Sequence, residues 1–236
     1  MKKKDKVLVI IPCFNEEKNI ELLIKNLKTN YKHYNTLVVD DCSEDKTFFV
    51  ASKISNSVSH VCNLGIGGAV QTGIKYADIK NYDYCVQIDG DLQHDPKFIE
   101  VLLKKSKQSK SSLTIGSRYF YKRDFSKNFL RVLGSLFISI LLRSLFDKLK
   151  ITDPTSGLRL MDKKAIKFFS DNYPQDYPEP ISIALLSKKN ELKITEVPVK
   201  MTDRKFGKSS IAGVDSLLYM FKISINILMI KIFLEK

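Results

Sequence analysis

Glycine and proline are scarce in this chain, with 10 and 7 among 236 residues. This scarcity excludes collagen-like and low-complexity character. No segment repeats along the chain at a period of about 20 to 50 residues, so a repeat architecture is excluded as well. A hydrophobic share of 44% and a charged share of 28% suit a globular domain.

Cysteine and histidine are too few and too dispersed for two common kinds of site. The residues in question are Cys13, Cys42, Cys62, Cys85, His33, His60 and His94. No C-x-x-C pair occurs, so the spacing of a zinc site is missing and reduced, buried thiols are expected. The histidines offer no catalytic triad, and we expect His94 to have a supporting or surface position.

Long apolar runs are missing too. No uninterrupted apolar stretch reaches the ~18 residues that a spanning helix needs. The longest uncharged runs, Val132–Leu142 and Ile223–Ile230, are each bounded by Lys or Arg. The basic start of the chain lacks the apolar core and cleavage site of a signal peptide. We therefore expect neither a spanning helix nor a secretory signal, whereas a helix lying on a membrane surface stays open.

The net charge of +13 is the strongest compositional signal. A surplus of this size attracts phosphate-bearing partners, whether nucleic acid, anionic lipid or nucleotide substrates. Aromatic residues are not interleaved with the lysine clusters, as base-stacking platforms would require. A basic, non-enzymatic nucleic-acid binder is therefore the weaker alternative, and no nucleic-acid partner is expected.

Short apolar segments alternate with amphipathic ones along the first half of the chain. The expected strands are Val7–Ile11, Thr36–Val39, Val58–Cys62, Tyr84–Ile88 and Leu113–Ile115. Helices are expected between them, with Asn15, Ser43 and Asp95 as N-terminal caps. This alternation predicts an α/β fold with a mostly parallel sheet and helices on both faces.

Polar motifs directly follow these expected strands. They are Pro12–Glu16, Asp40-Asp41, Asn63–Gly68 and Asp89-Gly90-Asp91. The carboxyl ends of strands in an open α/β sheet form the ligand crevice. The four motifs are therefore expected to converge on one site.

The pair Asp89 and Asp91 favours a metal site. Two carboxylates one residue apart at a strand end suit a hard divalent cation, and Gln93 adds an amide oxygen. Leaving two charges there without a partner would be costly. A surface turn is the plain alternative. A phosphatase with an aspartate nucleophile is another, although such motifs usually read D-x-D-x-[TV] and Leu92-Gln93 follow here.

Other polar groups have two interpretations each. Asp40 and Asp41 either bind a nucleobase or ribose or serve the turn. The glycines of 65–68 match the dinucleotide-binding fingerprint poorly and allow close approach to a ligand or a tight turn. Arg118 and Arg204 suit forked contact with phosphate, or are ordinary surface residues.

The segment 127–150 predicts a helix with apolar flanks and a narrow polar stripe. Arg131, Ser135, Ser139, Arg143 and Asp147 recur every four residues. Such a helix is either buried in the core or lies in a membrane interface, which its flanking basic residues favour. The tail, residues 217–236, is likewise apolar with interspersed lysines.

A set of ordered motifs resembles a known family. The motifs are Ile11-Pro12-Cys13-Phe14-Asn15-Glu16, Val39-Asp40-Asp41-Cys42-Ser43, Asp89-Gly90-Asp91-Leu92-Gln93-His94, Gly116-Ser117-Arg118-Tyr119, Asp153-Pro154-Thr155-Ser156-Gly157-Leu158-Arg159 and Arg204 with Gly207-Lys208-Ser209-Ser210. They resemble the family 2 glycosyltransferases of the GT-A fold, and among them the polyprenol-phosphate sugar transferases similar to dolichyl-phosphate mannosyltransferase. The resemblance runs to about Ile211.

The resemblance implies roles for individual residues. The expected nucleotide-sugar set is Pro12, Asn15, Glu16, Asp40, Asp41, Gly68, Asp89, Arg204 and Lys208. The expected metal ligands for Mg²⁺ or Mn²⁺ are Asp89, Asp91 and Gln93. The acceptor-phosphate set is Arg118, Arg131 and Ser135. The catalytic set is Asp91, Arg118, Asp153 and Glu179, of which Asp153 and Glu179 are candidates for orienting the sugar hydroxyls.

The resemblance also implies an activity. We expect an inverting hexosyltransferase that moves a sugar from a nucleotide-diphosphate sugar, UDP-sugar in preference to GDP-mannose, to undecaprenyl or dolichyl phosphate in cell-envelope glycan synthesis. A family 2 transferase with a saccharide hydroxyl acceptor is the alternative. Residues 1–211 would form the catalytic domain, including an interfacial helix at 127–150, and residues 212–236 a membrane-associating helix. A peripheral position on the cytoplasmic side of the membrane, with a small integral membrane partner, is expected.

Overall fold

The computed structural model describes residues 5–121, 129–147, 149–189, 191–202 and 215–234. The first half contains β1 (Val7–Cys13), α1 (Glu17–Asn30), β2 (Asn35–Asp40), α2 (Thr47–Ile54), β3 (Asn56–Ser59), α3 (Gly65–Ile79), β4 (Tyr84–Gln87), α4 (Phe98–Ser109) and β5 (Leu113–Ser117). The second half contains α5 (Phe129–Leu145), β6 (Arg159–Asp162), α6 (Lys163–Asn172), α7 (Pro178–Ser187), β7 (Ile194–Pro198) and α8 (Asp215–Phe233).

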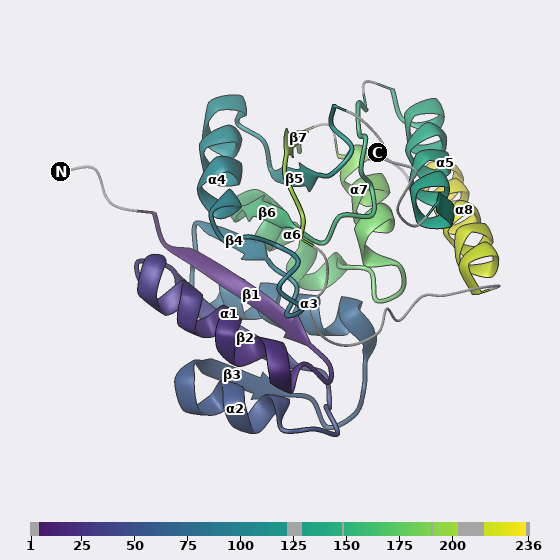
Figure 1. The fold of residues 1–236 in the computed structure, drawn as a ribbon. Helices are drawn as coiled ribbons and strands as arrows, with labels where there is room; N and C mark the ends of the chain where they lie inside the picture. The colour runs from purple at the N-terminus through teal and green to yellow at the C-terminus, as the bar shows by residue number, and fades with distance from the viewer. Residues whose placement is uncertain (1–4, 122–128, 148, 190, 203–214, 235–236) are drawn as a thin grey trace.

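The strands form one seven-stranded sheet in the order β3-β2-β1-β4-β6-β5-β7 (Figure 1). Every pairing is parallel except those of β6, which runs antiparallel to both β4 and β5. The predicted α/β class and mostly parallel sheet are therefore confirmed. Because β6 is reversed, its first residues lie at the same edge of the sheet as the last residues of β4 and β5.

The sheet is central because β1 is apolar on both faces. All seven of its residues are buried. Leu8 and Ile10 join the cluster that α3, α6 and α7 cover, whereas Val7, Val9 and Ile11 join the cluster under α1, α2 and α4. Side chains alternate between the faces of a strand, so a continuous apolar run is what a strand between two helix layers requires.

The sequence predicts the buried faces of the helices better than it predicts their first residues. The expected apolar face of α1, which includes Ile20 and Leu27, is buried. The expected caps Asn15 and Ser43 are wrong, because α1 and α2 begin after Glu16 and Lys46, which make no side-chain cap bond. Asn15 instead adopts a left-handed conformation with φ 55°, which asparagine tolerates better than most residues. Helix α4 begins after Lys97, whose N–H donates to Asp95 Oδ1 at 3.0 Å.

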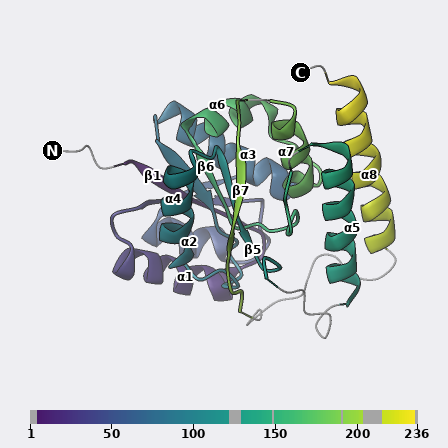
Figure 2. The ribbon, with the colours of Figure 1, turned by 90° about the horizontal axis from the view of Figure 1, so that it is seen from above.

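Helices α5 and α8 lie side by side at one edge of the molecule (Figure 2). Ile138 and Leu142 of α5 and Ile227 of α8 belong to the main core. The outward sides stay apolar, and their exposed residues are Phe129, Leu133, Phe137 and Ile140 on α5 and Phe221, Ile225, Leu228, Met229, Ile232 and Phe233 on α8. Helix α5 is thus a core helix on one side and an exposed apolar helix on the other, and its expected position in a membrane interface stays a prediction.

The two serines of the polar stripe of α5, Ser135 and Ser139, are buried, whereas Arg143 and Asp147 are exposed. Ser139 and Arg143 both donate to the carbonyl oxygen of Ile151, at 2.5 and 3.0 Å. Arg143 is nevertheless exposed, so the expectation of a basic stripe turned toward lipid phosphates stays a prediction there. Within the described ranges, no helix is long and apolar enough to cross a membrane.

Candidate active site

The four polar motifs converge at the carboxyl edge of the sheet, as expected. The Asp41 N–H donates to the Cys13 carbonyl oxygen at 2.8 Å, which joins the ends of β1 and β2. The Leu64 N–H donates to the Asp41 carboxylate at 2.9 Å, which adds the glycine-rich segment. Gly90 lies against the end of β1, because a Cβ on it would sit 3.1 Å from the Cys13 sulfur.

The Asp89 and Asp91 carboxylates occupy the loop after β4. The Asp89 side chain is 33% exposed, and Asp91 accepts the Gln93 N–H at 3.0 Å. The Gln93 side-chain nitrogen donates to the Thr202 carbonyl oxygen at 3.4 Å, so the side-chain oxygen of Gln93 is directed away from Thr202. Two carboxylates and an amide oxygen fit a hard divalent cation.

Three neighbours surround the Asp89 carboxylate, one of them His94 from the same motif. Gln87 is fully buried on β4 and its side-chain nitrogen donates to Asp89 Oδ1 at 3.4 Å. His94 is buried, and its Nδ1 accepts the Asp89 N–H at 3.4 Å and lies 3.7 Å from Asp89 Oδ2. Gly157 packs on the carboxylate so closely that a Cβ there would lie 2.5 Å from Oδ2. Of the two expected positions of His94, the surface one is therefore wrong, and the residue lies beside Asp89.

No group of three or more His, Cys, Asp and Glu side chains forms a metal-binding cluster in the part of the chain that the structure describes. A cation at Asp89 and Asp91 would thus need oxygen atoms from other sources, such as Gln93 and a bound diphosphate. This is the donor chemistry that Mg²⁺ accepts readily, since it is usually bound by one or two carboxylates plus substrate phosphates. The residues fit the expected metal.

The expected nucleoside edge is a tight network of turns. Asn15 donates its N–H to Ser43 Oγ and accepts the Glu44 N–H on Oδ1, both at 2.9 Å. The Glu16 N–H donates to Thr47 Oγ1 at 2.8 Å. Pro12 is buried in β1. These contacts place Pro12, Asn15 and Glu16 together beside Asp40 and Asp41, and their role toward a nucleotide stays a prediction.

Asp40 and Asp41 are both buried, and each has a different environment. Asp40 Oδ2 accepts from Ser59 Oγ at 2.8 Å, whereas its buried Oδ1 has no hydrogen-bond partner among the described residues. Asp41 Oδ1 lies 2.8 Å from His60 Nδ1, and His60 Nε2 lies 2.9 Å from Thr72 Oγ1. The two ring nitrogens of His60 thus bridge Asp41 and the Thr72 hydroxyl. His60, which the sequence pattern left without a role, therefore holds Asp41 in place.

The glycine-rich segment owes its small residues to packing. A Cβ on Gly67 would lie 2.1 Å from the Gln175 carbonyl oxygen, and a Cβ on Gly68 would lie 2.5 Å from the Leu64 Cβ. These contacts are within the protein, so the requirement for glycine at 67 and 68 does not depend on a ligand. The expected contact of Gly68 with the nucleotide sugar stays a prediction.

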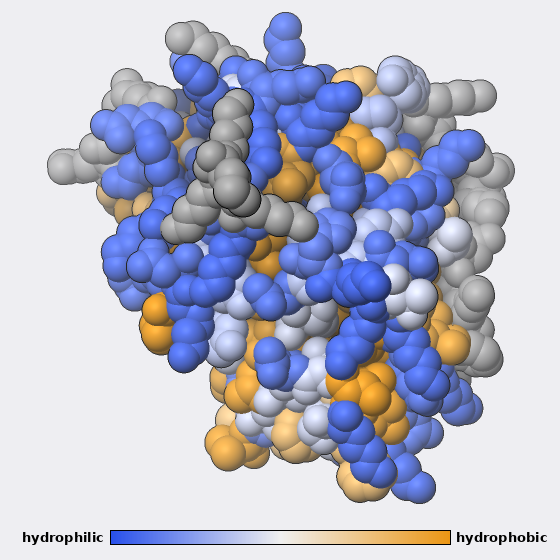
Figure 3. All heavy atoms as spheres, turned by 90° about the vertical axis from the view of Figure 1, so that its left-hand side faces the viewer, coloured by the Kyte–Doolittle hydropathy of each residue, from blue (hydrophilic) through white to orange (hydrophobic). Residues whose placement is uncertain are grey.

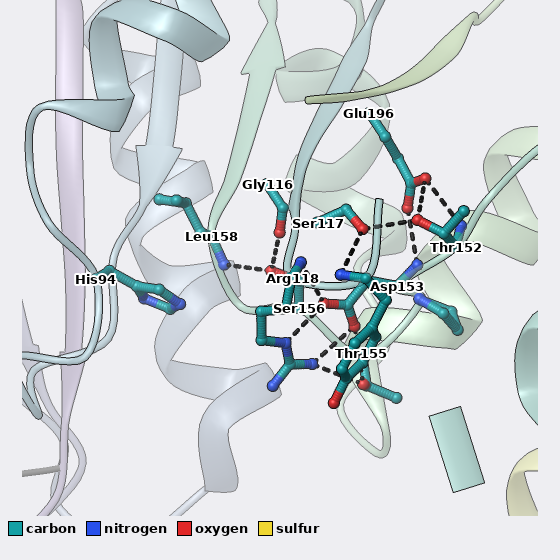
Figure 4. A network of polar contacts seen from close by, with 12 residues as sticks. His94, Gly116, Ser117, Arg118, Thr152, Asp153, Thr155, Ser156, Leu158 and Glu196 are labelled. Atoms are coloured by element: carbon teal, nitrogen blue, oxygen red, sulfur yellow. Dashed lines mark hydrogen bonds and ion pairs between the residues drawn. The ribbon is translucent and has the colours of Figure 1, made fainter. Parts of the chain in front are cut away.

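Arg118, directly after β5, is held by a forked ion pair with Asp153 (Figure 4). Its side-chain Nε and Nη2 donate to the two Asp153 carboxylate oxygens at 2.6 and 2.7 Å. Its backbone N–H donates to the same carboxylate at 3.0 Å. Nη2 also donates to Thr155 Oγ1 at 3.0 Å. Burial would raise the pKa of Asp153, but the Arg118 guanidinium outweighs that effect and holds the pKa below its ordinary value.

The Asp153 side chain has no exposed surface, and that of Arg118 is 13% exposed. Asp153 therefore acts on Arg118 in this arrangement, and its expected contact with sugar hydroxyls stays a prediction. Burial would lower the pKa of the Arg118 guanidinium, but Asp153 outweighs that effect and Asp89 adds to the rise. Arg118 directly follows β5, whose end lies at the same edge of the sheet as the end of β4, which Asp89 follows.

Glu179 lies in the first turn of α7, next to the same crevice. Burial raises the pKa of its carboxyl group, Arg159 opposes this and Asp89 reinforces it. Arg159, fully buried at the start of β6, donates to the carbonyl oxygens of Ser156, Glu179 and Pro154 at 2.6, 2.7 and 2.7 Å. Arg159 thereby ties the segment that carries Asp153 and Gly157 to α7, which the motif alone did not predict.

The remaining expected residues are less fully placed. Ser135 is 2% exposed, and its hydroxyl has no hydrogen-bond partner in the described structure. Arg131 belongs to α5, but its side chain lies outside the described residues, as do Arg204 and Lys208. The last described residue before Arg204 is Thr202. Its backbone N–H donates to the Gln93 carbonyl oxygen and its hydroxyl donates to the Leu92 carbonyl oxygen, both at 3.0 Å.

Comparison with known proteins agrees with this geometry. The chain is 32% identical to the UDP-N-acetylglucosamine--dolichyl-phosphate N-acetylglucosaminyltransferase of Methanococcus voltae, over 95% of this chain and 96% of that protein. It is 31% identical to the dolichol-phosphate mannosyltransferase of Pyrococcus furiosus, over 88% of this chain and 60% of that protein.

Among solved structures, glucosyl-3-phosphoglycerate synthase from Mycobacterium tuberculosis, in complex with Mn²⁺, UDP and phosphoglyceric acid, has the same fold. The TM-score is 0.72 with 19% identity, over 98% of this chain and 80% of that one. Residues 8–169 match the family model described as glycosyl transferase family 2. The chain therefore belongs to glycosyl transferase family 2 and is a hexosyltransferase of GT-A-like fold.

Proposed function

We propose that this enzyme transfers a sugar, with inversion, from a nucleotide-diphosphate sugar to a polyprenyl phosphate. The observation that carries the proposal is the meeting of two kinds of group at one edge of the sheet. Asp89 and Asp91 suit a metal-bound diphosphate, and Arg118, fixed by Asp153, suits a second phosphate beside it. The names of the two curated relatives support a dolichyl-type lipid phosphate as the acceptor.

The chemistry follows from the ionisation of such an acceptor. A phosphate monoester is already anionic at neutral pH. One of its oxygens attacks the anomeric carbon, the bond from that carbon to the diphosphate breaks, and the nucleoside diphosphate leaves with the electron pair. The protein must therefore align two anions rather than remove a proton, and fixed cationic groups such as Arg118 reduce their repulsion.

A divalent cation, Mg²⁺ or Mn²⁺, would neutralise the charge that develops on the departing diphosphate. Asp89, Asp91 and Gln93 would hold it. Asp41, held by His60, and the neighbouring Asp40 would bind the nucleoside. UDP is the preferred nucleotide because one relative is named for a UDP-sugar, and GDP-mannose is the alternative because the other is a mannosyltransferase.

The second part of the proposal is a peripheral position on the cytoplasmic face of the membrane. The outward sides of α5 and α8 carry large apolar side chains, with Phe137 46% and Phe221 65% exposed, and Lys222 and Lys231 beside them. The face seen in Figure 3, on the opposite side of the molecule, is mainly hydrophilic with scattered apolar groups. An apolar, lysine-flanked surface on one side suits the interface of an anionic bilayer. A small integral membrane partner and a role in cell-envelope glycan synthesis belong to the same hypothesis.

A donor and acceptor screen tests the activity. Purified enzyme with Mg²⁺ or Mn²⁺ would be incubated with labelled UDP-glucose, UDP-N-acetylglucosamine or GDP-mannose and with undecaprenyl or dolichyl phosphate. Label should move into the organic phase only when a lipid phosphate is present. Transfer to a free saccharide with none to lipid phosphate would refute the proposal and favour a hydroxyl acceptor, for which Glu179, with its raised pKa, would be the candidate base.

A further inference from the structure

A buried carboxylate on the edge strand β7 organises the segment that holds Arg118. Glu196 is 8% exposed. It accepts the Thr152 N–H and the Thr152 hydroxyl on Oε2, both at 2.8 Å, and the Asp153 N–H on Oε1 at 2.9 Å. Both carboxylate oxygens are thus used to grip two consecutive residues (Figure 4).

These contacts reach Arg118 by a short chain of bonds. Glu196 fixes the backbone of Asp153, and the Asp153 carboxylate accepts two guanidinium hydrogen bonds from Arg118. A second route runs through hydroxyl groups, because Thr152 Oγ1 lies 2.6 Å from Ser117 Oγ, on the residue just before Arg118. Strand β7 is in parallel register with β5, which ends at Ser117, so Glu196 is delivered to this place by the sheet itself.

Burial of the Glu196 carboxylate carries a desolvation cost. The arrangement places a second carboxylate next to Asp153, with the Arg118 guanidinium bound to only one of the two. Burial raises the pKa of Glu196, although its hydrogen bonds to Asp153 and Thr152 oppose the rise. Removing a carboxylate from water without a cation beside it is unfavourable. The three hydrogen bonds from Thr152 and Asp153 offset part of that cost, so the carboxylate and the segment it binds hold each other in place.

We infer that Glu196 is a positioning residue for the transfer reaction, acting through Asp153 to set the Arg118 guanidinium against the acceptor phosphate. The inference rests on the proposed function of Arg118. Neither the motifs nor the family resemblance assigned Glu196 a role. It does not touch substrate itself, since its two oxygens are occupied by Thr152 and Asp153.

The test uses Glu196→Gln in the full chain. A glutamine of the same size keeps one acceptor oxygen but turns an N–H₂ toward one of the gripped N–H groups, so at least one bond is lost. We expect the KM for lipid phosphate to rise about 10-fold while the affinity for the donor nucleotide changes less than about twofold. Thr195→Val is the matched control, because Thr195 is the neighbouring residue of β7 and its hydroxyl bonds to Ser111 instead. It should leave both values unchanged.

A double-mutant cycle separates positioning from general destabilisation. Arg118→Ala alone should raise the KM for lipid phosphate, and adding Glu196→Gln should raise it no further. If the two effects multiply, or if Glu196→Gln weakens donor and acceptor equally, the inference is wrong. If Arg118→Ala leaves the acceptor KM unchanged, the proposed function of Arg118 fails instead.

A measurement without substrate keeps the inference testable in that case. The Nε–H of Arg118, bound to Asp153, should give a slowly exchanging NMR signal that Arg118→Lys identifies by its loss. Glu196→Gln should speed its exchange about 10-fold, and Thr195→Val should not. An unchanged exchange rate in Glu196→Gln would overturn the link from Glu196 to Arg118.

Discussion

Gly157→Ala tests whether the segment before β6 closes the proposed metal site. A Cβ at this position would lie 2.5 and 2.8 Å from the two Asp89 carboxylate oxygens and 3.0 Å from their carbon. Ordinary contacts of this kind are longer, so the Asp89 carboxylate would have to retreat by roughly 0.5 to 1 Å. Gly157 has no positive φ, so the effect of alanine is steric and not a backbone penalty.

The size of the effect differs between stability and activity. The Asp89 side chain is 33% exposed and can move toward solvent, so the overpacking cost should be at the low end, about 1 kcal/mol. For a chain of this size that lowers Tm by roughly 2 to 4 °C. Misplacing a reacting or ligating group by about 1 Å can cost roughly 100-fold in rate. We therefore expect kcat/KM to fall about 100-fold with little loss of fold.

Calorimetric titration of UDP with and without Mn²⁺ is the direct assay. The metal-dependent gain in affinity should shrink in Gly157→Ala, whereas metal-free binding should not change. Gly73→Ala is the matched control, because its Cβ would lie 2.3 Å from the buried Ile10 side chain, inside the core. It should lower Tm and keep the metal-dependent gain. A normal metal-dependent gain in Gly157→Ala would refute the reasoning.

Three further predictions follow from the same geometry. Asp91→Asn should abolish divalent-dependent transfer with an unchanged circular dichroism spectrum, and transfer that persists in excess chelator would contradict the metal assignment. The pKa of Asp153 is lowered in the folded protein, so its ion pair with Arg118 stabilises the fold fully above the unfolded pKa of about 3.9. This stabilisation is lost as the pH falls through the folded pKa. In urea unfolding between pH 2 and 6, the free energy of unfolding should therefore fall less steeply with acid in Asp153→Asn than in wild type. Phe137→Asp with Ile140→Asp should stop flotation with anionic vesicles and keep nucleotide binding, whereas Phe49→Asp on α2 should float like wild type; equal flotation of all three would contradict membrane docking by α5.

The sequence alone determined the fold class and much of the crevice. Apolar runs such as Val7–Ile11 identify buried strands because both faces of a central strand must be apolar. The motifs that follow them, including Asp40-Asp41 and Asp89-Gly90-Asp91, could be expected to meet because parallel strands end at one edge. Their convergence depends on chain direction and periodicity, which are local properties.

Other features required the tertiary structure, since they depend on pairs of residues far apart in the chain. Strand β6 runs antiparallel and brings the segment around Asp153 to Arg118, which lies 35 positions earlier in the sequence. Glu196 grips that segment from β7, and His60 grips Asp41 from the end of β3. The sequence around a buried carboxylate or histidine does not indicate which distant residue it binds.

The same distinction applies to α5. Its sequence is too apolar for a one-sided surface helix, which leaves a core helix and an interfacial helix open, with the flanking basic residues favouring the second. Only the packing of α5 against α8 and the core decides which side is buried, and it buries Ser139, which donates to the Ile151 carbonyl oxygen, while Phe137 stays exposed. Composition sets how much apolar surface a helix has, whereas the arrangement of its neighbours determines which part of that surface remains in contact with solvent.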